Sequence, residues 1–136
     1  MIKFRMFGIH IDQFAILSKS APLEDLGLGV NLNYKYANKG RIISCSTEFN
    51  FLNSAQEKIM ILAITCEFEI EENDYKNIHT NEKTIIPKEL LEYFAVHTIG
   101  TARGILFCKT ESTPYNNIII PPLNVSEMIK DDMVIF

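Results

Sequence analysis

Three successive segments of this chain alternate apolar and polar residues, and this pattern restricts the fold more than any other feature. Residues 28–36, 43–51 and 59–70 carry apolar side chains at every second position. Period-two alternation is typical of strands with one buried face and one face in solvent. Turn-forming residues separate them, at Asn38-Lys39-Gly40 and at Asn53-Ser54. The segments therefore predict an antiparallel sheet of consecutively paired strands.

An earlier apolar run, roughly from Phe4 to Leu17, predicts a fourth strand of the same sheet. Its apolar phase shifts near Gln13 and Phe14. A shift of phase inside a strand favours a bulge, because one extra residue moves the later side chains to the opposite face.

The second half of the chain changes from period two to helical spacing. Residues 71–86 are polar and predict a connector. Pro87 suits the first position of a helix, and Pro114 marks its expected end. Between them, one apolar stripe at helical spacing is formed by Leu91, Ala95, Ile99, Ala102 and Leu106.

This helix has little polar surface between Glu92 and Arg103, so we expect it to be buried on more than one side. One sheet covers one side, and a second copy of the chain would cover the other. Gly100 and Gly104 lie four residues apart, and each costs about 1 kcal/mol in a helix interior. Close contact between two helices would offset that cost; a kink or a frayed end is the alternative. The predicted oligomer interface consists of Ile99, Gly100, Arg103, Gly104 and Phe107.

The C-terminal segment reads as an extended apolar run followed by a short helix. Ile118-Ile119-Ile120 is stopped by Pro121-Pro122. Asn124 then suits an N-cap, and Glu127 three residues later suggests a capping box.

Length, charge and cysteine usage limit the class of protein. With 136 residues, of which 47% are hydrophobic, we expect one domain over 1–136 with a sizeable core. The formal charge of −4 argues against nucleic-acid binding, which needs a basic surface. Three widely spaced cysteines favour a reducing, cytoplasmic compartment. No stretch is long and apolar enough to predict insertion into a membrane.

Residues that could carry catalysis are scattered along the chain. His10, His79 and His97 belong to different predicted elements, and none has a partner at metal-ligand spacing. Cys66 alternates inward and reads as a small core residue, whereas Cys108 near the helix end lacks a nameable activating partner. We therefore expect no enzyme activity, no metal and no cofactor.

Four carboxylates cluster where the third alternating run ends, at Glu67, Glu69, Glu71 and Glu72. Glu67, Glu69 and Glu71 would share one strand face and could form an acidic patch for a basic partner. The alternative is a solvated strand end that enters a polar loop.

The order of elements and several local motifs resemble SecB, the preprotein-translocase chaperone, and the wider group of SecB-like proteins. The four-stranded half contains Cys66-Glu67-Phe68, similar to a Cys-Glu-hydrophobe step in the family's fourth strand. A polar connector follows, then the long helix from Pro87 with Arg103. The passage from Ile118 to Val125, Ile-Ile-Ile-Pro-Pro-Leu-Asn-Val, is close to the family's sequence before its last helix.

The resemblance implies an α+β fold: a four-stranded antiparallel sheet with one long helix and a short C-terminal helix. It implies a homodimer or homotetramer that binds unfolded polypeptide or preproteins without ATP or metal, and that has a role in protein export. It also implies an acidic sheet surface for the SecA motor; Glu67 matches that surface, but Gln13 and Leu17 do not. Candidate groove residues, chosen for size and for closeness to the connector, are Phe68, Ile70, Tyr75, Ile78, Phe94 and Tyr115.

Two other functional readings remain open at this point. The chain could be a dedicated oligomeric partner of one protein, such as an antitoxin, that keeps the fold without general chaperone activity. It could also bind a small ligand in the same groove.

Overall fold

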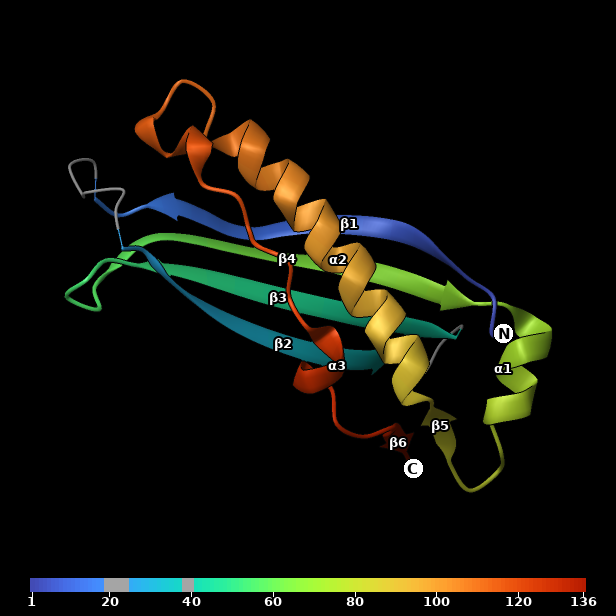
Figure 1. The fold of residues 1–136 in the computed structure, drawn as a ribbon. Helices are drawn as coiled ribbons and strands as arrows, with labels where there is room; N and C mark the ends of the chain where they lie inside the picture. The colour runs from blue at the N-terminus through green and yellow to red at the C-terminus, as the bar shows by residue number, and fades with distance from the viewer. Residues whose placement is uncertain (19–24, 38–40) are drawn as a thin grey trace.

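The structure is a computed structural model that describes residues 1–18, 25–37 and 41–136. The predicted turn at Asn38-Lys39-Gly40 lies outside the described residues. One long helix runs obliquely across one face of a twisted antiparallel sheet, and the chain then returns over the same face (Figure 1). The fold is therefore α+β, as predicted.

The main sheet has four strands in the order β1-β4-β3-β2. Their bounds are β1 Phe4–Ile16, β2 Gly27–Ala37, β3 Ile42–Leu52 and β4 Lys58–Ile70. The three later strands pair consecutively, which confirms the prediction from the alternating segments. The first strand joins the far side of β4, so β1 and β2 form the two edges of the sheet.

Two bulges interrupt the pairing of β1 with β4. One register shift lies between Ile11 and Gln13, where the sequence phase predicts it. A second lies between Met6 and Gly8 and was not predicted. Each shift changes which residues of β1 face the helix side of the sheet: Met6 before the shift at Phe7, Ile9 and Ile11 between the two shifts, and Phe14 after the shift at Asp12.

The polar segment 71–86 connects β4 to α2, as predicted, but it also contains secondary structure that the sequence pattern did not indicate. It contains a short helix, α1 Glu72–Ile78, and a short strand, β5 Thr84–Ile86. The Glu71 carboxylate accepts a hydrogen bond from the backbone N–H of Asp74 at 3.0 Å, which caps α1. The partner of β5 is β6 Met133–Ile135, close to the C-terminus, so local sequence carries no sign of this ladder.

The long helix, α2 Lys88–Lys109, begins and ends within a few residues of its predicted bounds. Pro87 is the N-cap residue and not the first helical residue, because its extended ψ of 145° lies outside the helical region. Asp132 instead caps the helix from a distance, since its Oδ1 accepts from the Lys88 N–H at 2.7 Å. The helix also ends before Pro114, which begins the 3₁₀ helix Pro114–Asn117.

The last helix, α3 Val125–Met128, follows Asn124 as predicted, but the capping box does not form. The Asn124 side chain makes no capping hydrogen bond, and its backbone carbonyl accepts from the Glu127 N–H at 3.2 Å. The Ile129 N–H also donates to the Val125 carbonyl at 3.0 Å and closes the short helix.

The core lies between the sheet and α2. The inward side chains of β3 and β4 meet the buried stripe of α2, which consists of Leu90, Leu91, Phe94, Ala95, Thr98, Ile99, Ala102 and Leu106. The predicted inward residues of β4, from Met60 to Ile70, are fully buried. Burial of this apolar surface against one side of α2 is the main stabilising interaction of the fold.

Candidate functional site

Four of the six predicted groove residues belong to the core of the single chain. Phe68 and Phe94 stack on each other with ring centroids 4.4 Å apart and an interplanar angle of 18°. Both are fully buried, as are Ile70 and Tyr115. These side chains offer no surface to a ligand in this conformation, because the closely packed sheet and α2 enclose them.

The other two groove candidates, Tyr75 and Ile78, are half-buried on α1. The Tyr75 hydroxyl contacts the Tyr36 hydroxyl on β2, and the Tyr75 ring stacks on His79 at 5.0 Å between centroids. The Nδ1 atom of His79 lies 2.6 Å from the Thr84 hydroxyl on β5. Burial raises the pKa of Tyr36 to about 12. This cluster joins α1 and β5 to the end of β2.

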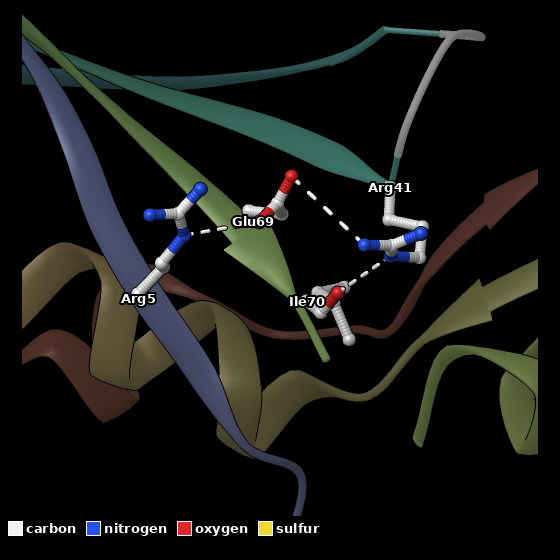
Figure 2. Close-up of polar contacts among 4 residues, drawn as sticks. All are labelled: Arg5, Arg41, Glu69 and Ile70. Atoms are coloured by element: carbon white, nitrogen blue, oxygen red, sulfur yellow. Dashed lines mark hydrogen bonds and ion pairs between the residues drawn. The ribbon is translucent and has the colours of Figure 1, made fainter. Parts of the chain in front are cut away.

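Two of the predicted acidic residues, Glu67 and Glu69, share the outer face of the sheet, whereas Glu71 lies beyond the end of β4; each of the three has a partner within the chain. Glu69 Oε1 accepts from Arg5 Nε at 3.0 Å, and Glu69 Oε2 lies 3.9 Å from Arg41 Nη2. Figure 2 shows the two arginines on either side of Glu69. Arg41 Nε also donates to the Ile70 carbonyl at 2.9 Å, so the guanidinium joins the start of β3 to the end of β4.

Glu67 contacts His10 on β1, and Glu71 caps α1. Gly8 allows the first contact, since a Cβ there would lie 2.8 Å from the Glu67 carboxylate. The charge of Glu69 is therefore partly neutralised by Arg5 and Arg41, and Glu67 is in contact with the His10 ring. The acidic patch for a basic partner stays a prediction, with Arg5 and His10 from β1 lying beside Glu69 and Glu67.

The predicted interface on α2 divides into exposed and internal residues. Gly100, Gly104 and Phe107 lie on the exposed side, but Ile99 is buried against the sheet. Arg103 Nε donates to the Ile120 carbonyl at 2.7 Å, so this side chain is engaged inside the chain. The sequence placed all five residues on one interface because it could not show where the segment after α2 returns.

The exposed side of α2 is largely apolar. It carries Tyr93, Val96 and Phe107, which are 45–55% exposed. Nothing lies within 4 Å of a Cβ built at Gly100 or at Gly104, so packing within the chain does not require either glycine. The neighbouring β1 residues Ile9 and Ile11 are also about half exposed on the helix side of the sheet.

Three surface hollows flank α2, and sequence patterns indicated none of them. The first holds about 430 Å³ near the start of the helix and is lined by Met1, Ile2, Pro87, Glu89, Leu90 and Tyr93. The second holds about 390 Å³ between β1 and the end of the helix, beside Ile11, Gly104, Ile105 and Cys108. The third holds about 330 Å³ beside β2 and includes Leu32, Tyr34, Leu91, Met128 and Met133. Each joins residues that are distant in the sequence.

The thiols and the histidines gather into no metal site among the described residues. Cys45 and Cys66 lie opposite each other in the β3–β4 ladder and are both buried free thiols. Burial raises the pKa of both, that of Cys45 to about 11. Cys108 is exposed, and the exposed His97 lies with its ring 5.7 Å from that of Phe4. Along the described chain, no helix has the length and hydropathy needed to cross a bilayer.

Comparison with known proteins identifies the fold. No protein-family model and no curated protein sequence matches the chain. Among solved structures, it is similar to a SecB-like chaperone of Mycobacterium tuberculosis in complex with a ChAD peptide from the HigA1 antitoxin. The TM-score is 0.55 at 16% sequence identity, and the match covers 89% of this chain and 91% of that chain. The chain therefore has the α+β fold of a SecB-like chaperone.

Proposed function

We propose that this protein is an ATP-independent, SecB-like chaperone that binds unfolded or extended polypeptide, including preproteins for export, in the cytoplasm. The single observation that carries the proposal is the largely apolar exposed surface of α2 within a SecB-like fold. Extensive exposed apolar surface is unfavourable in a monomer and is typical of protein-binding sites. The free thiols are compatible with a reducing compartment. Binding of this kind needs no catalytic group.

A second copy of the chain is the proposed occupant of the centre of this surface. Gly100 and Gly104 leave an open, flat strip where another helix can approach closely. The cost of about 1 kcal/mol for each glycine is offset only if such an approach occurs. The exposed β1 side chains Ile9 and Ile11 extend the apolar surface beyond the helix. We therefore propose a homodimer or a homotetramer assembled through α2.

The test of chaperone function is suppression of aggregation. A chemically unfolded client is diluted into buffer without nucleotide, and light scattering is followed with and without the protein. We expect scattering to fall as the protein is added, and addition of ATP to change nothing. An unrelated folded protein at equal mass serves as the control. Unchanged aggregation of several clients at a several-fold excess of the protein would contradict the proposal.

A dedicated partner protein is the second candidate function, and one observation favours it. The similar M. tuberculosis chaperone was solved with a peptide from an antitoxin. If this chain likewise serves one partner, a pull-down from the native host should recover one dominant protein. A broad range of unfolded proteins in the same pull-down would instead support the general chaperone.

The SecA motor is the least supported of the proposed partners. A basic surface that docks on Glu67 and Glu69 would have to displace Arg5, Arg41 and His10. Exposed ion pairs are each worth about 0.2–1 kcal/mol. SecA could therefore displace them, but the net free energy of SecA binding would be smaller. Binding of SecA to the wild type and to an Arg5→Ala variant, measured by calorimetry, tests this partner. Tighter binding by the variant is expected if Glu67 and Glu69 form the docking site.

A further inference from the structure

Two of the cysteines lie directly opposite each other on the two central strands of the main sheet. Cys45 of β3 pairs with Cys66 of β4 in the antiparallel ladder, and both are fully buried free thiols. Side chains at directly opposed positions lie on the same face of a sheet. The sheet therefore holds two thiols side by side on the face that α2 covers.

The register brings the two sulfurs within reach of a disulfide bond. Directly opposed residues of antiparallel strands have Cβ atoms about 4.5–5.5 Å apart. A disulfide requires a separation of about 3.5–4.5 Å between the two Cβ atoms. A small movement of the two strands toward each other is therefore sufficient to form the bond. The movement leaves the bond strained, and strained disulfides are reduced more easily than relaxed ones.

The middle of α2 protects the thiols while it is closed over the sheet. Burial raises the pKa of both thiols, that of Cys45 to about 11, and the Thr98 hydroxyl beside both sulfurs opposes this rise. Thr98 is itself fully buried, and its hydroxyl donates to the Phe94 carbonyl of the preceding turn at 2.7 Å. Both thiols therefore stay protonated at neutral pH, whereas the thiolate is the form that reacts. A closely packed interior also has no room for an oxidant.

Cys66 is the thiol nearer to an opening in the surface. The Thr101 hydroxyl lies beside Cys66, and Thr101 also lines the hollow of about 390 Å³ between β1 and the end of α2. Cys45 lies farther from this hollow, because β4 separates β3 from β1. Hydrogen peroxide is hardly larger than water, so it can pass an opening that is too narrow for an alkylating reagent. A peroxide molecule that enters as α2 lifts slightly meets Cys66 first.

We propose that Cys45 and Cys66 form a redox modification site, which hydrogen peroxide oxidises to a cross-strand disulfide when α2 lifts slightly from the sheet. The Cys66 thiolate attacks one oxygen of the peroxide; an S–O bond forms, the O–O bond breaks, and the other oxygen takes up a proton and leaves as water. The Cys45 thiolate then attacks the Cys66 sulfur; the S–S bond forms, the S–O bond breaks, and a second water leaves. Two thiols and one peroxide thus give one disulfide and two waters.

The site is a redox-sensitive device within the fold and does not depend on the proposed polypeptide binding. The disulfide forms only in chains whose α2 has opened. It marks those chains until a thiol reductant restores the two thiols by exchange. In the closed chain the thiols persist, as expected in a reducing compartment.

Mass spectrometry of the oxidised chain tests the bond. The parent for this experiment is the full chain with Cys108→Ser, which removes the exposed thiol, and Gly100→Leu, which keeps a second copy from covering α2. After treatment with hydrogen peroxide in buffer without denaturant, we expect this chain to lose two hydrogen atoms. A digest should contain residues 45 and 66 in one cross-linked peptide, and dithiothreitol should restore the original mass. If no cross-link forms after prolonged treatment, the inference is overturned.

The dependence of the oxidation rate on urea separates a slight opening of α2 from complete unfolding. The two thiols can also pair in an unfolded chain, so the rate is measured at urea concentrations below the unfolding transition. Oxidation through local opening should depend on urea much less steeply than global unfolding does, because local opening exposes less surface. Equal slopes would show that only unfolded chains are oxidised, and the folded chain would then have no such site.

Single-thiol variants of the same parent test the order of attack. Cys45→Ala leaves Cys66 without a partner, so peroxide should add oxygen to Cys66 and no disulfide should form within the chain. Cys66→Ala is the matched control, because it removes the same group from the opposite strand. Its remaining thiol, Cys45, should be oxidised several-fold more slowly. Circular dichroism confirms that both variants are folded, and faster oxidation of Cys45 than of Cys66 would contradict the assigned order.

Discussion

The guanidinium of Arg103 holds the backbone at Ile120: Nε donates to the Ile120 carbonyl at 2.7 Å, and Nη2 donates to the Pro121 carbonyl at 2.8 Å. The two carbonyls follow the 3₁₀ helix, where the chain turns back over the sheet. Two adjacent donors on one planar group suit two successive carbonyls. One residue of α2 thereby fixes the path of the C-terminal segment.

Loss of this clamp should destabilise the protein. We expect Arg103→Ala to lower the free energy of unfolding by about 2 kcal/mol, because hydrogen bonds to charged groups are each worth roughly 1.5–3 kcal/mol and this side chain is partly exposed. Urea denaturation followed by circular dichroism provides the measurement. Arg5→Ala removes an exposed arginine and should cost less than about 1 kcal/mol. Equal stability of the two variants would contradict the assigned role.

Variants of Phe94 test whether this residue only packs in the core or also contacts a client. Because its ring is fully buried against Phe68, Phe94→Ala should cost about 3–5 kcal/mol of stability. Phe94→Leu keeps most of the volume and should cost clearly less. If Phe94→Leu remains folded and yet loses client binding, the prediction of a groove residue gains support. Retained binding would leave Phe94 with a core role alone.

The size of the particle in solution tests assembly through α2. Gly100→Leu should leave the single chain folded, since a Cβ there meets nothing and leucine is a better helix former by about 1 kcal/mol. It should also separate the oligomer, because two helices can no longer approach. Light scattering of the native protein and the variant measures the change.

The control for this experiment is Glu111→Leu, which adds the same side chain at an exposed residue after α2. This variant should keep the size of the wild type. A monomeric wild type would refute the interface proposal without further measurement.

Alkaline pH should destabilise the fold through its buried thiols. The pKa of Cys45 is raised by burial from 9.0 in the unfolded chain to about 11 in the fold. Between these values the unfolded chain binds fewer protons than the folded chain, so stability falls as pH rises from about 9 to about 11. Denaturation midpoints across this range should therefore decrease. Cys45→Ala should decrease less steeply, and an identical slope would contradict the assignment.

Thiol labelling gives an independent measurement of the same burial. In the Gly100→Leu variant, in which no second copy is expected to cover α2, one thiol for each folded chain should react with an alkylating reagent within minutes at neutral pH, namely the exposed Cys108. Cys45 and Cys66 should react only after unfolding. Rapid native labelling of all three would show that α2 does not stay closed over the sheet.

Much of the fold could be predicted from local sequence patterns, because these patterns mainly reflect the burial of one face of each strand. Alternation in β2, β3 and β4 reflects burial of one sheet face, and the shift near Gln13 marks a real bulge. The helix and the strand within the connector 71–86 were not predicted, because neither has a local apolar period. Its strand β5 depends on β6, almost fifty residues away, and α1 has no buried residue to produce an apolar stripe.

The candidate site was less predictable than the fold. Large apolar side chains such as Phe68 and Tyr115 have the same appearance in a sequence whether they line a core or a groove, and the structure buries both. The hollow beside β2 depends on where Met128 and Asp131 return to the sheet. That return is a long-range contact, and no local period reports it.

The sequence by itself determined the strands, the long helix and the apolar character of the helix on more than one side, because these follow from the period of the side chains. Only the tertiary structure decided which side of α2 is covered, that Arg5 and Arg41 neutralise Glu69, and that Asp132 caps α2. Each of these contacts joins segments that are distant along the chain and that meet only when the chain folds. The physical reason is that the hydrophobicity of each residue already indicates whether its side chain tends to be buried. An ion pair or a strand ladder also needs a partner from a distant segment, and only folding places that partner.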